Sequence, residues 1–297
     1  MMREYGFVRT RKAVYRLFGR HHPPGKALLL LRYHRSAGRW HKPGVFEAEV
    51  MSGAVLDLYD VPLRPVHHYG IALGVAPLDS DTVTGYFDPL AAVHGSAAPS
   101  LCRAAGLAEG TVGVTGSRLV GLAHRNSDLD LVVYGPDGPA AGAEILRTSS
   151  LSQERAAEVS STMRRMRSLN GIPVPRETER NIFKGVVRDG ARERKLDLHY
   201  AESDEDATSL PLPASLPVGE RHLRRVTVVD AGRRHLFPGQ LECRTADGRA
   251  CAVWINDHVL SLLLPGDRFS AVCTEVRIEP DDAAQYVART VTEVALR

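Results

Sequence analysis

Two aspartates set one residue apart carry the strongest chemical signal in this chain. Asp128 and Asp130 lie in the stretch SDLDLVVYG, where they alternate with apolar residues. Such alternation predicts a β-strand whose two carboxylates leave the same face, with Cα atoms about 6.6 Å apart. Carboxylates this close repel each other unless a positive charge lies between them. Because Mg²⁺ is usually held by one or two carboxylates plus substrate phosphates, the pair predicts a site for metal and phosphate together.

Gly116 and Ser117 lie a short way before the aspartates and offer the second half of such a site. A glycine at a strand end lets the backbone approach a ligand closely. The N–H groups that follow it, together with a serine hydroxyl, can cradle phosphate oxygens. The two stretches together therefore predict a ligand that carries phosphate.

The run GSRLVGLAHRNSDLDLVV resembles the defining motif of the DNA polymerase β-like nucleotidyltransferase superfamily, and it is also similar to stand-alone prokaryotic proteins of that kind. In the motif, Gly-Ser is followed by an Asp-x-Asp pair with hydrophobic neighbours. The resemblance implies that Ser117 contacts the outer phosphates of a nucleoside triphosphate. It also implies that Asp128 and Asp130 bind two Mg²⁺ ions, or Mn²⁺ in their place.

The superfamily also has a third carboxylate, on a later strand, which activates the attacking hydroxyl group with one metal ion. Asp197, in RKLDLHY, is the acid of this chain with the matching setting, and His199 shares its face of the expected strand. Two ions would then clamp an in-line displacement at the α-phosphorus, with pyrophosphate leaving. Many small members of the family have Arg-Gly where this chain has Val120-Gly121, so one phosphate contact is either missing or supplied by Arg118.

Simpler interpretations stay open for each acid. An Asp-x-Asp pair in a strand is common on solvated sheet edges, and Asp197 also fits a surface strand acid. A degenerate copy of the domain would keep the fold and bind nucleotide without catalysis.

A stripe of basic residues precedes Asp197 and suggests where an anion could bind. Its members recur every four residues after Pro175: Arg176, Arg180, Lys184 and Arg188. On a helix, like charges at this spacing are mildly destabilising unless an anion lies across them, so the stripe could receive triphosphate or a polyanionic acceptor. A solvated helix face neutralised by nearby acids is an equally good interpretation, and Gly185 weakens the helix itself.

The elements that must position these residues form a mixed α+β fold. We expect a strand-rich N-terminal domain (1–88), a polymerase β-like nucleotidyltransferase domain (89–204), a linker (205–222) and a small β-barrel-like C-terminal module (223–297). Within the middle domain the patterns predict helices at Ala91–Gly106 and Ser152–Leu169, and strands at Thr111–Val114, Asp128–Tyr134 and Arg194–Tyr200.

Composition narrows the classes of function without choosing one. The 297 residues are 43% hydrophobic and 25% charged, as in ordinary globular proteins. The net charge of +3 is too small to demand nucleic acid. The apolar run 27–31 is far too short to span a bilayer, so we expect a cytoplasmic protein with no membrane partner. The four cysteines lack metal-ligand spacing, which favours reduced thiols.

The sequence thus favours a Mg²⁺-dependent nucleotidyltransferase that uses ATP or another nucleoside triphosphate and a hydroxyl-bearing small molecule as acceptor. The expected metal ligands are Asp128, Asp130 and Asp197. The expected nucleotide-binding residues are Gly116, Ser117, Arg118, Arg180 and Lys184. Template-independent addition to an RNA 3′ end is the second hypothesis, and a non-catalytic nucleotide-binding protein is the third.

Overall fold

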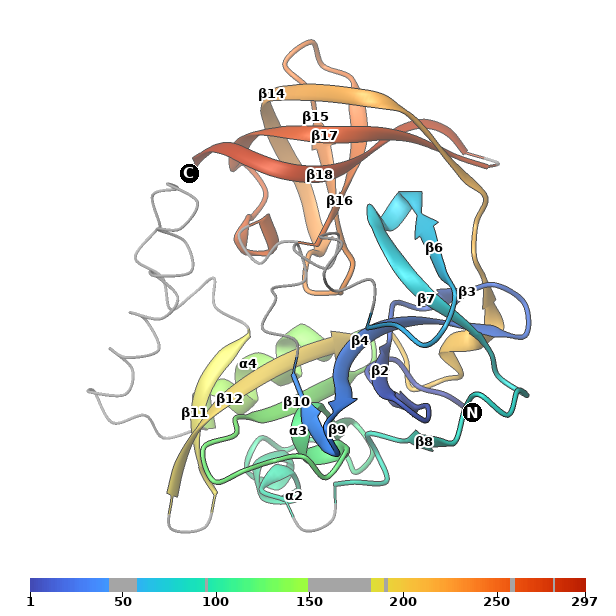
Figure 1. Ribbon diagram of the computed structural model, residues 1–297. Coiled ribbons are helices and arrows are strands. Elements are labelled where there is room, and N and C mark those ends of the chain that lie inside the picture. Colours follow the sequence, from blue (N-terminus) through green and yellow to red (C-terminus); the bar gives the residue numbers. More distant parts are fainter. Residues whose placement is uncertain (43–57, 94–95, 149–182, 190–191, 257–259, 280) are drawn as a thin grey trace. The chain divides into compact units, whose positions relative to one another are not determined.

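The computed structural model describes residues 1–42, 58–93, 96–148, 183–189, 192–256, 260–279 and 281–297 (Figure 1). The predicted helix Ser152–Leu169 and the predicted nucleotide-binding residue Arg180 lie outside these residues. The chain divides into two compact units. In the part of the chain that the structure describes, the larger unit falls within Met1–Pro65, Ala72–Ala156 and Ile182–Leu212, and the smaller unit within Val66–Ile71 and Pro213–Arg297.

A seven-stranded sheet occupies the N-terminal part of the larger unit. Its path is β6 (Leu63–Val66), β7 (Ile71–Pro77), β4 (Lys26–Ser36), β2 (Ala13–Leu17), β1 (Phe7–Arg9) and β8 (Gly85–Phe87), with β5 (Arg39–His41) paired to β4. The run ALLLL at 27–31 lies in the first half of β4 and is buried throughout, so both faces of the sheet are covered there. A short parallel pair, β3 (His21–His22) and β13 (Leu210–Pro211), also belongs to this unit.

A second sheet of four strands carries the predicted acids. Its order is β11 (Lys184–Asp189), β12 (Arg192–Ala201), β10 (Leu129–Tyr134) and β9 (Val112–Val114). The central strands β10 and β12 are parallel, while the two outer strands run antiparallel to them. Three strands predicted from alternating apolar residues are therefore confirmed to within two residues at each end.

Three helices accompany this sheet in the described residues: α2 (Ala98–Ala104), α3 (Gly116–Leu119) and α4 (Gly138–Thr148). Helix α4 packs against β10 and β12, and α2 packs against β9 and α4 (Figure 1). The helix expected at Ala91–Gly106 is shorter than predicted, because the Ser96 hydroxyl accepts the Ala98 N–H and Pro99 lies in the first turn. Among the helices described, none has the length and apolar character needed to cross a membrane.

The smaller unit contains a closed barrel of five strands. Their order is β14 (Ser215–Arg233), β15 (Gly239–Arg244), β16 (Ala250–Ile255), β18 (Asp281–Ala295) and β17 (Arg268–Ile278). Residues 215–222, which the sequence analysis placed in a linker, form the first part of β14. Three free cysteines, Cys243, Cys251 and Cys273, are buried in its core.

The fold as a whole is mixed and strand-rich with few helices in the described residues, as predicted.

A short segment outside the barrel sequence belongs to the smaller unit. The 3₁₀ helix η2 (His67–Tyr69) lies between β6 and β7 in the chain, and the Tyr69 ring lies 6.1 Å from the ring of Trp254 on β16. Gly70 has φ +67°, and a Cβ there would lie 2.5 Å from Val287 Cγ1 on β18. Packing this close explains why a glycine follows the helix.

His22 is a fully buried histidine in the larger unit. Its Nδ1 accepts the Leu28 N–H at 2.8 Å, so Nε2 carries the proton and lies 3.2 Å from the Gly19 carbonyl oxygen. Burial lowers the pKa of His22 to about 4, because the charged ring would lose its hydration. The folded protein therefore holds this ring neutral at pH values where an unfolded chain protonates it.

We predict that this histidine makes the fold sensitive to mild acid. Between about pH 6.5 and pH 4 the unfolded state binds the extra proton, so the free energy of unfolding falls as pH falls, by up to about 3 kcal/mol from this group. Urea unfolding at several pH values should show a steeper loss for the wild type than for His22→Gln. The exposed His41→Gln variant should keep the wild-type slope. Equal slopes for wild type and His22→Gln would contradict the prediction.

Candidate active site

The register of the two parallel strands brings two predicted acids together. Asp130 on β10 lies directly opposite Asp197 on β12. The flanking pairs, Leu129 with Leu196 and Leu131 with Leu198, are buried in the core. Because side chains alternate along a strand, burying these leucines turns both carboxylates to the opposite face of the sheet.

Asp128, the residue before β10, is the third acid of the group. Its side chain is half-buried. Burial raises the pKa of Asp128, and the negative charges of Asp197 and Asp130 raise it further. The three carboxylates are therefore close enough to repel one another, which is the situation that a bound cation relieves.

Lys184 lies beside Asp197, and it reaches that place from a strand. The sequence analysis placed it on a helix, but Lys184 begins β11 and pairs in register with Asp197. Its Nζ lies 2.7 Å from Asp197 Oδ1. The buried Val186 and Val187 suit a strand rather than a solvated helix, which explains the difference.

His199 faces Asp130 from the same side of the sheet. Its Nε2 lies 4.0 Å from Asp130 Oδ1, and its ring lies 4.9 Å from the ring of Tyr5. Burial alone would raise the pKa of Asp130, but the adjacent His199 and the positive charges of Arg32 and Lys42 outweigh it and lower the pKa. Asp130 is therefore ionised at neutral pH, as a metal ligand must be.

Gly116 makes room for the Asp130 carboxylate. It has φ +67°, and a Cβ at this position would lie 2.0 Å from Asp130 Oδ2. The preceding Thr115 N–H donates to the Asp130 carbonyl oxygen at 2.9 Å, which fixes the turn against β10. The predicted residues Ser117 and Arg118 follow in α3, and both are half-buried.

The N-terminal part of the chain contributes residues that the sequence analysis did not select. The Tyr5 carbonyl oxygen accepts a hydrogen bond from Thr115 Oγ1 at 2.8 Å. Tyr33 on β4 packs with Leu119 and Val120 of the α3 region. Neither residue is acidic, and neither belongs to a recognisable sequence motif. The one available signal was the polar pair Arg32–Tyr33 directly after the apolar run of β4.

The donor set suits a hard divalent cation. Within the described residues, no group of three or more His, Cys, Asp or Glu side chains is arranged to hold a metal ion, and Lys184 is bonded to Asp197 instead. The chemistry nevertheless fits, since three carboxylates crowd one face and Gly116 makes room for the Asp130 carboxylate among them. Asp128, Asp130 and Asp197 are the residues that could hold such an ion.

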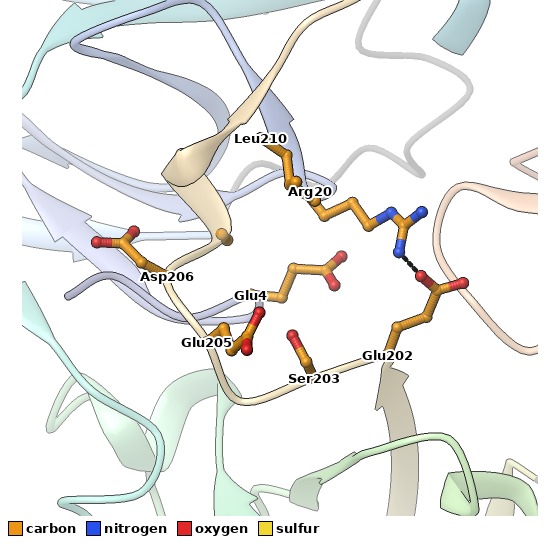
Figure 2. A pocket seen from close by; sticks show the side chains of 8 residues that line it. Glu4, Arg20, Glu202, Ser203, Glu205, Asp206 and Leu210 are labelled. Atoms are coloured by element: carbon orange, nitrogen blue, oxygen red, sulfur yellow. Dashed lines mark ion pairs between the residues drawn. The ribbon is translucent and has the colours of Figure 1, made fainter.

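A small pocket elsewhere in the larger unit does not fit a nucleotide. Arg20, Glu4 and the turn after β12 line it, and Arg20 forms an ion pair there with Glu202 (Figure 2). Its volume is about 30 Å³, which is room for one or two water molecules. The acidic group on β10 and β12 is therefore the better candidate site.

Comparison with known families agrees with this choice. Residues 97–206 match the model of a family described as a nucleotidyltransferase domain. The matched range contains the Gly-Ser motif and all three acids, and it confirms the polymerase β-like resemblance. The search of curated proteins and the search of solved structures each found no match to the chain.

We predict that a side chain at Gly116 destabilises the fold because it would collide with the Asp130 carboxylate. Gly121 has a similar φ of +71°, but a Cβ there meets nothing within 4 Å. Both Gly→Ala variants carry the backbone strain, and only Gly116→Ala adds the clash with Asp130. Urea unfolding should show an extra loss of about 1–3 kcal/mol for Gly116→Ala. Equal losses for the two variants would show that the contact with Asp130 carries no cost.

Proposed function

We propose that this chain, which carries a nucleotidyltransferase domain over residues 97–206, moves a nucleoside monophosphate from a nucleoside triphosphate to a hydroxyl group of a small molecule. One observation carries the proposal. The parallel register sets Asp130 beside Asp197, while Gly116 lies against the Asp130 carboxylate. One phosphate-bearing ligand could therefore contact the carboxylates and the backbone at Gly116 at the same time.

Asp128, Asp130 and Asp197 would hold Mg²⁺, with Mn²⁺ as an alternative that also takes oxygen ligands. When bound, such ions supply positive charge that stabilises the α-phosphate and the departing pyrophosphate. His199 helps to lower the pKa of Asp130, so this carboxylate is ionised at neutral pH and able to bind a cation. Lys184 offsets part of the negative charge at Asp197.

The chain's own residues would position the reacting groups. Gly116 and Ser117 would donate backbone N–H and hydroxyl hydrogen bonds to the outer phosphates. Asp197 would orient the attacking hydroxyl group and accept its proton. The hydroxyl oxygen then bonds to the α-phosphorus, the bond to the bridging oxygen breaks, and pyrophosphate leaves. Arg118 and Arg180 are further proposed phosphate contacts.

A small-molecule acceptor fits the charge better than a nucleic acid. The net charge is only +3, and the sequence has no basic segment interleaved with aromatic residues. The regions 1–88 and 223–297 are proposed to select the acceptor. We also propose a cytoplasmic location, which the four free cysteines support.

We predict that each acid is required for pyrophosphate release. Asp128→Asn, Asp130→Asn and Asp197→Asn should each lower the rate at least about a thousandfold, since the charge stabilisation lost amounts to several kcal/mol. The assay is pyrophosphate release from each ribonucleoside triphosphate with Mg²⁺ and a metabolite extract. The exposed Asp137→Asn variant is the matched control and should keep wild-type activity. Activity retained by Asp130→Asn would refute the proposed site.

The same assay with total RNA in place of the extract separates the acceptors. Release that depends on Asp130 and on RNA, with binding that weakens steeply as salt rises, would favour addition to an RNA end. Nucleotide binding without release in either mixture would favour a non-catalytic binding protein.

A further inference from the structure

Strand β4 contains an irregularity at the residue that follows its apolar run. Tyr33 pairs with Val14 on β2, but the next pair joins Leu31 to Tyr15. Arg32 is therefore the extra residue of a β-bulge. In a regular strand Arg32 and Tyr33 would leave opposite faces, whereas a bulge re-aims a side chain and is frequent next to active sites.

Both residues at this bulge lie near parts of the acidic site. Tyr33 is buried and packs against Leu119 and Val120, directly after the Gly-Ser turn. Burial raises the pKa of Tyr33, and Ser117, the predicted phosphate contact, is close enough to the phenol to lower it in part. The half-buried Arg32 lies near enough to Asp130 for its charge to lower the pKa of that carboxyl. The bulge thus brings an arginine and a tyrosine to the two halves of the site.

An arginine is suited to the ligand that this site is proposed to take. The planar guanidinium group binds phosphate oxygens through two parallel hydrogen bonds, and it is always charged. The candidate site is acidic, so a polyphosphate needs nearby positive charge besides a metal ion. The family match begins at residue 97, and the nucleotidyltransferase domain itself does not contain Arg32.

We infer that Arg32, the extra residue of the bulge in β4, is a phosphate-binding residue of the nucleotide site, contributed by the N-terminal sheet. The ligand class is the polyphosphate chain of a nucleoside triphosphate, or the pyrophosphate that leaves. This inference rests on the proposed function. It assigns the sheet a direct part in binding substrate.

Calorimetric titration of the full chain in magnesium buffer tests this assignment. The ligands are ATP, inorganic pyrophosphate and adenosine, and the variants are Arg32→Ala, Arg32→Lys and Arg35→Ala. Arg35 lies on the same strand and is exposed, so it is the matched control. Arg32→Ala should weaken the binding of ATP and pyrophosphate at least tenfold and leave adenosine unchanged. Arg32→Lys should recover part of the loss, and Arg35→Ala should bind as the wild type does.

The outcomes separate this inference from the function on which it rests. If Arg32→Ala binds ATP and pyrophosphate with wild-type affinity, the inference is wrong and the proposed function stands. A loss that is equal for all three ligands, with a lower melting temperature, assigns Arg32 a structural role and also overturns it. If the wild type binds no nucleoside triphosphate and releases no pyrophosphate, the proposed function fails and this inference fails with it.

Discussion

Mutual repulsion among carboxylates is the constraint that the four-stranded sheet of the larger unit has to meet. Two parallel strands hold Asp130 and Asp197 side by side, and they can do so because the leucines on either side are buried. A slip of β12 by one residue against β10 would turn Asp197 toward the core, where an unpaired charge is costly. The apolar pattern therefore enforces an arrangement that the acids alone would oppose.

The groups that lie against these carboxylates come from several parts of the chain. Lys184 arrives on an antiparallel strand, and His199 lies on the same strand as Asp197. Tyr5 supports the histidine ring from the N-terminal segment, which is held in turn by the Thr115 hydroxyl. The residues packed around the candidate site thus extend beyond the range that the family model matches, and they include Tyr5 of the N-terminal segment.

The sequence could predict those parts of the site that depend on neighbouring residues. Asp128, Asp130 and Gly116 are recognisable because strand alternation and a glycine turn are local patterns. Asp197 could be placed by its leucine neighbours. Lys184 was misplaced on a helix because spacing of four is a helical period, and nothing near it shows that β12 is its partner. The bulge at Arg32 could not be predicted, since a bulge exists only relative to the strand opposite.

The segment around Tyr69 has a consequence for how this architecture could arise. It lies in the chain between two strands of the N-terminal sheet, yet it is packed within the smaller unit against Trp254 and Val287. The smaller unit is therefore not one continuous stretch of sequence. A gene fragment that encoded only the C-terminal strands would lack the segment at 66–71, which belongs to the same unit. A substitution in the barrel at Trp254 or Val287 would therefore have to suit the loop at 66–71 as well.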